Sequence, residues 1–157
     1  MRSAIVFSLL ALATTGCAPR KIPGTELDDT SETRAVIDVL QKFRAAVEKK
    51  DADAIVKMAD KSFRDDGGSS NPDDDLDYAS LGPKLAARMA KMSNVKLDVT
   101  VRRIEFDDES KMARVTYSYQ VSFSLPEYTS RTQSENDIKQ MLLKRVGEDE
   151  WKIASGI

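Results

Sequence analysis

The segment Lys111–Leu125, with the sequence KMARVTYSYQVSFSL, carries the most regular pattern in the chain. From Ala113 onward every odd position holds an apolar or aromatic side chain, whereas the even positions hold Arg114, Thr116 and small or neutral polar residues. Successive side chains of a strand point to opposite faces, so the segment predicts a long strand with one apolar and one polar face. Other parts of the chain must then cover the apolar face.

The same alternation occurs on both sides of this segment. Val95–Phe106 alternates before it, and two adjacent polar residues, Arg102 and Arg103, break the phase and indicate a β-bulge. Ser134–Val146 and Trp151–Ser155 are the strands predicted after it. Because these strands are consecutive and joined by short turns, we expect a four-stranded antiparallel meander.

Helical periodicity precedes the strands. Thr30–Lys50 has apolar residues at three- and four-residue steps, and Asp29 or Ser31 can cap its start. A shorter helix is expected at Asp51–Ala59 and a third at Pro83–Met92. A run of helices followed by a run of strands predicts an α+β fold, with the N-terminal helices packed on a curved antiparallel four-stranded sheet.

Composition excludes several classes of function. The chain has 157 residues with 24 basic and 26 acidic side chains, and it lacks the basic stripe that nucleic-acid binding requires. It has no histidine, which removes the commonest general base and metal ligand, and its single cysteine, Cys17, cannot form an internal disulfide. In the aspartate-rich segment Asp65–Asp77, the series Asp73-x-Asp75-x-Asp77 is not followed by the glycine of a calcium-binding loop, and Lys84 stands where that loop has glutamate. We interpret it as a solvated loop and predict no metal site and no cofactor.

The first residues have the pattern of a secretory signal. Arg2 supplies a positive charge, Ala4–Ala13 is an apolar run too short to cross a bilayer, and small residues lead up to Gly16 and Cys17. The end of this pattern resembles the lipobox of bacterial lipoproteins, with Thr14 where that family usually has an aliphatic residue. The resemblance implies that Cys17 is lipidated, with palmitate-type chains, and anchors the protein in the outer membrane, facing the periplasm. Ordinary secretory cleavage, with Cys17 left as a thiol, is the alternative.

The chain then divides into three parts. Residues 1–16 are a predicted lipoprotein signal peptide, residues 17–29 a lipid anchor with a flexible tether, and residues 30–157 the folded domain. The tether is predicted because prolines, a glycine and charged residues occur in it without periodicity.

The folded domain also resembles a known superfamily. The first helix continues into KKDADAIVKMADKSF (residues 49–63), helical segments precede the meander, and WKIASG (residues 151–156) contains the last strand. This order resembles the nuclear transport factor 2-like superfamily, which includes ketosteroid isomerases and polyketide cyclases. The resemblance implies a pocket between the helices and the concave face of the sheet. Since folds of this kind host many activities, it does not specify a function.

Five residues are candidates for lining such a pocket. Tyr117, Tyr119 and Trp151 come from predicted strands, with Met58 and Phe63 at a mouth. Core packing is one interpretation of these side chains, and a small apolar ligand held beside tyrosine hydroxyls is the other. We therefore predict a lipid-anchored envelope protein with a non-catalytic binding or scaffolding domain that can hold a small apolar ligand.

Two alternative functions stay open. An isomerase- or cyclase-type enzyme would need a carboxylate base, for which Asp65 and Asp66 are the candidates, together with Tyr78. A protein-interaction module could instead use the polar face of the central strand, because a flat stripe of small uncharged side chains suits a homodimer. That stripe consists of Thr116, Ser118, Gln120, Ser122 and Ser124.

Overall fold

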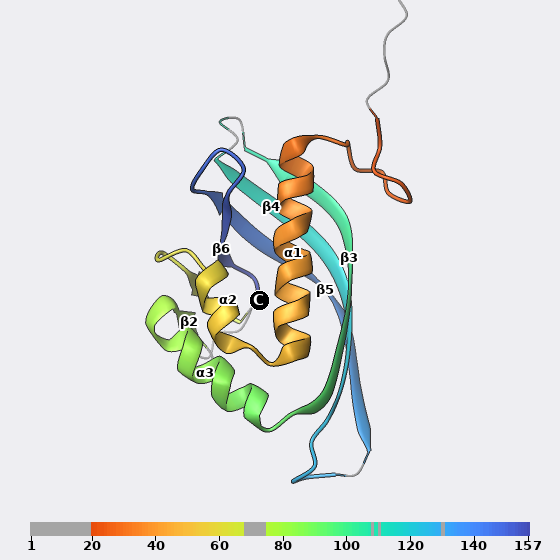
Figure 1. Ribbon diagram of the computed structural model, residues 1–157, viewed down its shortest axis with the longest axis vertical. Coiled ribbons are helices and arrows are strands. Elements are labelled where there is room, and N and C mark those ends of the chain that lie inside the picture. The colour runs from red at the N-terminus through yellow and green to blue at the C-terminus, as the bar shows by residue number, and fades with distance from the viewer. Residues whose placement is uncertain (1–19, 68–74, 108, 110, 130) are drawn as a thin grey trace, which may run out of the picture.

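The structure is a computed structural model that describes residues 20–67, 75–107, 109, 111–129 and 131–157; the predicted signal peptide and Cys17 lie outside this range. Three helices and a pair of very short strands precede a four-stranded sheet (Figure 1). The elements are α1 (Ser31–Lys49), α2 (Ala52–Met58), β1 (Arg64–Asp65), β2 (Leu76–Asp77), α3 (Tyr78–Ala90), β3 (Ser93–Phe106), β4 (Met112–Ser124), β5 (Thr132–Arg145) and β6 (Trp151–Ser155). None of the described helices is long and apolar enough to span a membrane.

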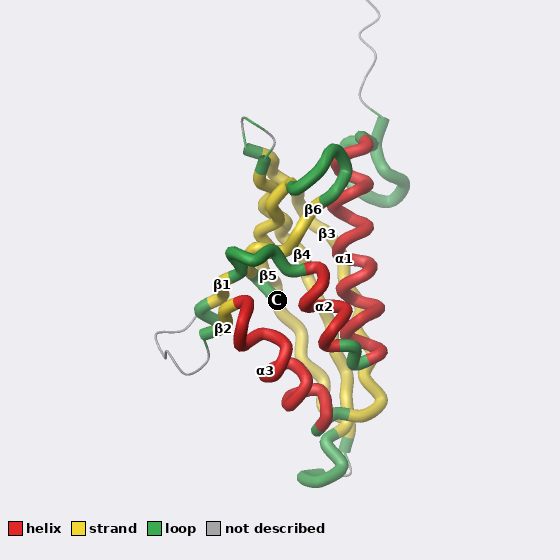
Figure 2. Tube along the Cα trace, turned by 60° about the vertical axis from the view of Figure 1, so that its left-hand side comes forward, coloured by secondary structure: helices red, strands yellow, loops and turns green. Residues whose placement is uncertain are grey.

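Strands β3 to β6 form one antiparallel sheet in the order β3-β4-β5-β6, which confirms the predicted meander. β4 is central, and it pairs with both neighbours along nearly its whole length. The β3–β4 register shifts between Val101 and Arg103, which confirms the bulge predicted at the two adjacent arginines. The helices lie on the same side of the sheet, so the fold is α+β, as predicted (Figure 2).

The apolar face of β4 forms the centre of the core. Ala113 and Val115 have no exposed surface, and Tyr117 is 3% exposed. α1 packs on this face because its apolar residues recur every three or four positions and form one stripe. The buried residues of α1 are Thr33, Val36, Val39, Leu40, Phe43 and Ala46. Each large apolar side chain buried in this way stabilises the fold by about 1.5–3 kcal/mol.

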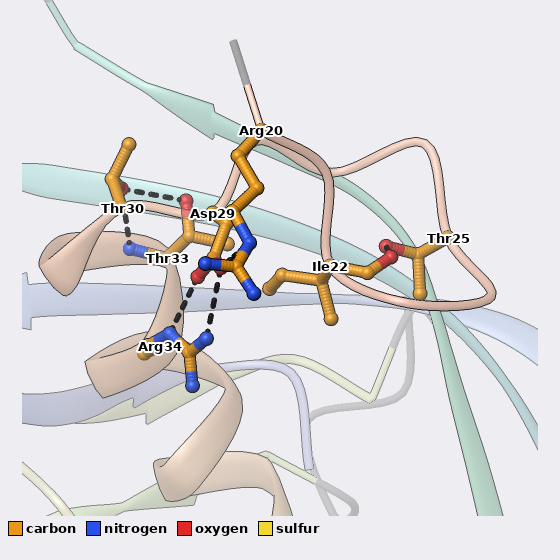
Figure 3. A network of polar contacts seen from close by, with 7 residues as sticks. All are labelled: Arg20, Ile22, Thr25, Asp29, Thr30, Thr33 and Arg34. Atoms are coloured by element: carbon orange, nitrogen blue, oxygen red, sulfur yellow. Dashed lines mark hydrogen bonds and ion pairs between the residues drawn. The ribbon is translucent and has the colours of Figure 1, made fainter.

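The start of α1 is fixed by polar contacts (Figure 3). Thr30 is the N-cap residue, and its Oγ1 accepts a hydrogen bond from the N–H of Thr33 at 3.0 Å. The sequence had offered its two neighbours for this role. Asp29 instead accepts hydrogen bonds from Nε and Nη2 of Arg34, at 2.5 and 2.9 Å, and pairs with Arg20 at 3.5 Å. The residue before the cap therefore ties the preceding segment to the first turns of the helix.

Residues 20–29, which we expected to belong to a flexible tether, form a closed loop against the domain. Lys21 and Asp28 form a β-bridge and an ion pair of 2.7 Å. Leu27 is 8% exposed, and together with Ile22 it borders a groove formed with α1 and β3. Burial of the Leu27 side chain thus fixes this segment on the domain, although its composition alone had predicted a flexible tether.

α3 begins earlier than the sequence predicted, at Tyr78 rather than Pro83. The carboxylate of Asp77 accepts a hydrogen bond from the N–H of Ser80 at 2.8 Å, and Ser80 Oγ accepts one from the N–H of Asp77 at 3.0 Å. This reciprocal pair is a capping box, and it outweighs the preference of proline for the first helical turn. Pro83 consequently lies inside the helix.

The sheet is open at one end. β6 pairs with β5 only from Leu142 to Arg145. Over the rest of its length, β5 has β4 on one side and no described strand on the other. Residues 134–140 of β5 are exposed as a result. The concave face of the sheet is therefore less covered here than beneath α1.

Candidate functional site

An apolar cavity of about 160 Å³ lies between the helices and the concave face of the sheet. α1 and α3 supply one wall, β3 and β4 supply the other, and β5 and residue 157 also line the space. The apolar side chains that line it are Phe43, Val47, Leu85, Met89, Met92, Val95, Leu97, Val121, Phe123 and Ile157. Because an apolar cavity of about 150 Å³ can hold benzene, this one has the size for a compact ring system.

The alternation of β4 builds one wall of the cavity. Tyr117, Tyr119, Val121 and Phe123 stand at every second position of the strand, and all four line the cavity. β5 pairs with β4 over this whole range, and β3 pairs with it as far as Ser122, after which the β3 register shifts between Lys96 and Ser93. Since paired neighbours on both sides hold the backbone in place, this wall is a fixed surface against which a ligand can be bound.

The two tyrosines differ in what their hydroxyl groups can do. Tyr117 is 3% exposed, and its hydroxyl donates a hydrogen bond to the main-chain oxygen of Gly156 at 3.1 Å. Tyr119 is partly exposed, and its hydroxyl makes no hydrogen bond within the described residues. Burial raises the pKa of both side chains, and the carboxylates of Asp137 and Glu135 add to this effect at Tyr119. Both hydroxyls are protonated at neutral pH, and that of Tyr119 is available to a ligand.

Charged side chains stand at the edge of the cavity. Arg88 comes from α3, and Glu135 and Lys139 come from β5, all three being exposed. The Nζ of Lys139 lies 5.8 Å from the centre of the Tyr119 ring, a cation–π distance. The arrangement combines an apolar interior with a polar edge, so it fits a ligand with an apolar body and one polar end.

The structure brings two of the five predicted pocket residues, Tyr117 and Tyr119, to this cavity. Phe63 does not line it: it is 1% exposed and belongs to the core. Met58, at the end of α2, is partly buried and packs against the same core. Their positions correspond to the core interpretation that the sequence left open for these side chains.

Trp151, the fifth predicted pocket residue, also lies away from the cavity. Its ring centre is 5.8 Å from that of Phe106, and the guanidinium of Arg145 stands 4.8 Å from the centre of the indole. β6 pairs with the part of β5 that lies beside the start of β4, whereas the cavity lies beside the later residues of β4. The pairing of β6 thus places Trp151 at the other end of the sheet.

The carboxylates considered as catalytic bases lie outside the apolar cavity. Asp65 and Asp66 line a separate polar pocket, and Tyr78 borders neither space. One carboxylate oxygen of Asp65 accepts hydrogen bonds from the main-chain N–H groups of Gly156, at 2.7 Å, and Ile157, at 3.0 Å. The carboxylate of Asp65 therefore binds the main chain of residues 156 and 157. Within the described residues, no three acidic, cysteine or histidine side chains converge as a metal site would require.

The polar face of β4 lies on the side of the sheet away from the helices. Thr116, Ser118 and Ser122 are partly exposed and Gln120 is exposed. Arg102, at the bulge of β3, donates a hydrogen bond from Nε to Ser118 Oγ at 3.1 Å. An arginine therefore reaches the stripe that the sequence predicted as flat and uncharged.

Sequence reasoning missed the helical wall of the cavity and its last residue. Leu85, Met89 and Met92 share one side of the third predicted helix, and that stripe was a usable signal. Val121 and Phe123 continue the alternation that identified the two tyrosines. Ile157 had no signal, because the sequence alone does not show where the chain turns after its last strand.

No protein-family model matches the chain, and no curated protein matches it. Solved structures do resemble it. A nuclear transport factor 2-like superfamily protein from Salmonella enterica serovar Typhimurium has a TM-score of 0.67 at 10% identity, over 80% of this chain and 88% of that chain. A conserved protein from Planctomyces limnophilus has a TM-score of 0.67 at 11% identity, over 80% and 93%. A ketosteroid isomerase-like protein from Erwinia carotovora has a TM-score of 0.62 at 12% identity, over 80% and 90%.

The chain therefore has the cone-shaped α+β fold of nuclear transport factor 2-like proteins, as its sequence predicted. At these identities the likeness concerns the fold alone. Proteins with this fold include isomerase-like proteins, so the fold does not decide between catalysis and binding.

Proposed function

We propose that the protein is anchored to the cell envelope through Cys17 and that its domain binds a small apolar ligand in the cavity beneath α1 and α3. The cavity is the observation that carries the proposal. Protein cores contain few voids larger than a water molecule, so an apolar space of about 160 Å³ is not a requirement of stability. Its apolar lining, with the hydroxyl of Tyr119 at the edge, has the character of a small-molecule site.

The positions of the carboxylates favour binding over catalysis. An isomerase-type reaction needs a base that reaches the bound substrate. Asp65 is occupied by the main-chain N–H groups of residues 156 and 157, and Glu135 is an exposed side chain at the edge of the cavity. The chain also has no histidine to replace them. An enzyme of the isomerase or cyclase kind is the alternative, and turnover lost on Glu135→Gln would support it.

Filling part of the cavity should weaken ligand binding. Indole or naphthalene should raise the melting temperature of the wild-type protein by mass action. We expect Val121→Phe to weaken this binding by about tenfold or more, a loss of ~1.4 kcal/mol, because the larger ring occupies the ligand space. Thermal shift and NMR titration would measure it. Val146→Phe is the matched control, since Val146 is 45% exposed and outside the cavity. Unchanged affinity in Val121→Phe would place the ligand elsewhere.

Anchoring through Cys17 is supported by the charged start, the apolar run and the Gly16–Cys17 pair. We expect Cys17→Ser to accumulate as an unprocessed precursor and to lose lipid labelling. Labelling with a fatty-acid analogue, membrane fractionation and the mass of the mature chain would measure both effects. Thr14→Leu is the control, because it brings the segment closer to the lipobox and should leave processing intact. Fractionation of Cys17→Ser identical to that of the wild type would contradict the anchor.

A homodimer through the polar face of β4 is a further proposal, supported by the position of that face away from the helices. We expect Ser118→Arg to convert the dimer to a monomer, because it places a second arginine beside Arg102 at the contact. Light scattering would measure the mass. Ala87→Arg, on the exposed side of α3, is the control and should leave the dimer intact. A wild-type mass equal to one chain would contradict the proposal.

A further inference from the structure

The last two residues of the chain lie between two separate spaces. One is the apolar cavity, and the other is a polar pocket of about 1120 Å³ bordered by Asp65, Asp137 and Ser155. Ile157 and Lys139 line both. The end marked C lies near the middle of the molecule in both views (Figure 1 and Figure 2). Residue 157 is therefore part of the boundary between the two spaces.

Hydrogen bonds from three strands hold this segment in place. The carboxylate of Asp65, on β1, accepts from the N–H groups of Gly156 and Ile157, at 2.7 and 3.0 Å. The hydroxyl of Tyr117, on β4, donates to the main-chain oxygen of Gly156 at 3.1 Å. The Nζ of Lys139, on β5, donates to the main-chain oxygen of Ile157 at 3.3 Å. Four hydrogen bonds therefore hold residues 156 and 157 in a defined position.

The backbone of Gly156 adds a steric constraint. Its φ is +89°, a conformation that glycine adopts readily and other residues rarely do. A Cβ atom at this position would lie 1.9 Å from the main-chain oxygen of Gln140 and 2.7 Å from the Cα of Met141. The segment thus crosses β5 at a distance that only glycine permits.

We propose that Gly156–Ile157 is a fixed wall that limits the apolar cavity to compact ligands, and that Asp65 is the residue that holds this wall closed. The inference rests on the proposed ligand-binding function and specifies its ligand class. With the wall in place, the cavity takes a molecule of the size of one or two fused rings. Without it, the cavity joins the polar pocket and takes a longer amphiphile, with the chain on the apolar lining and the polar end beside Asp137.

The experiment compares two probes, indole and n-decanol, on the full-length protein. Ile157→Gly removes the side chain of the wall, and Asp65→Ala removes the acceptor for both N–H groups. Asp98→Ala is the matched control, because Asp98 is an exposed residue of β3 outside both spaces. Calorimetric titration measures both affinities. Hydrogen exchange at the amides of residues 156 and 157 measures the wall, and Trp151 fluorescence verifies that each variant is folded.

We expect the wild type and Asp98→Ala to bind indole and to bind n-decanol weakly. Ile157→Gly and Asp65→Ala should each bind n-decanol at least about tenfold more tightly, a gain of ~1.4 kcal/mol. In Asp65→Ala the two amides should also exchange faster. If indole binds but neither variant gains affinity for n-decanol, the proposed role of the wall is wrong and the proposed function is retained. If neither probe binds to any variant, the proposed function fails, and the inference fails with it. Should Asp65→Ala not fold, Ile157→Gly decides the outcome.

Discussion

Phe63→Ala is expected to lower the free energy of unfolding by about 3–5 kcal/mol, the usual range for a buried phenylalanine. Phe63 is 1% exposed and belongs to the same cluster of buried side chains as Ile55, Leu81 and Ile153. Truncation would remove the apolar ring from this cluster and leave a void in the packing. Urea denaturation, followed through the fluorescence of the single tryptophan, Trp151, would measure the loss.

Met58→Ala is the informative comparison for Phe63→Ala. Both residues were predicted to line the mouth of a pocket, yet Met58 is only partly buried. Because less of its surface leaves water on folding, we expect a loss of about 1 kcal/mol. Neither substitution should change the affinity for indole in the fraction that stays folded. A small stability loss in Phe63→Ala combined with a large loss of ligand affinity would contradict the core assignment and return Phe63 to the pocket.

The fold was predictable because its main elements carry strong periodicity. β4 alternates from Ala113 to its end, α1 has an apolar stripe, and both lie where the sequence predicted them. The predicted start of α3 was wrong because the residue that caps the helix, Asp77, lies in an aspartate-rich segment that we had interpreted as a loop. A capping box depends on a single pair of side chains. In a polar segment such a pair is harder to recognise than a repeating pattern.

The site was predictable only in part, because two kinds of information are absent from a sequence pattern. Periodicity assigns Tyr119 to the covered face of the sheet, but it assigns core residues to the same face in the same way. Whether an apolar side chain lines a cavity or fills the core depends on how the helices pack above it. Asp65 forms hydrogen bonds with residues 156 and 157, which are 91 and 92 positions away in the sequence. No local sequence pattern predicts these contacts.

Gly156→Ala is the second substitution with a large expected effect. The added Cβ would overlap the main chain of β5 at Gln140, so either β5 must shift or residues 156 and 157 must leave their place. Leaving would break the two hydrogen bonds that Asp65 accepts and those that Tyr117 and Lys139 donate, each of which contributes about 0.5–1.5 kcal/mol. We therefore expect a loss of about 2–4 kcal/mol in the free energy of unfolding.

Gly24→Ala separates this overlap from backbone strain. Gly24 has a φ of +78°, similar to that of Gly156, but a Cβ there would meet nothing within 4 Å. Strain alone should make Gly24→Ala lose about 1 kcal/mol. If the two variants lose the same free energy of unfolding in urea denaturation, the close approach at Gln140 does not contribute to the loss. Unequal losses, with faster hydrogen exchange at the amide of Ile157, would show that the segment has left its place. Because Ile157 lines the apolar cavity, that result would connect one backbone contact to the shape of the ligand site.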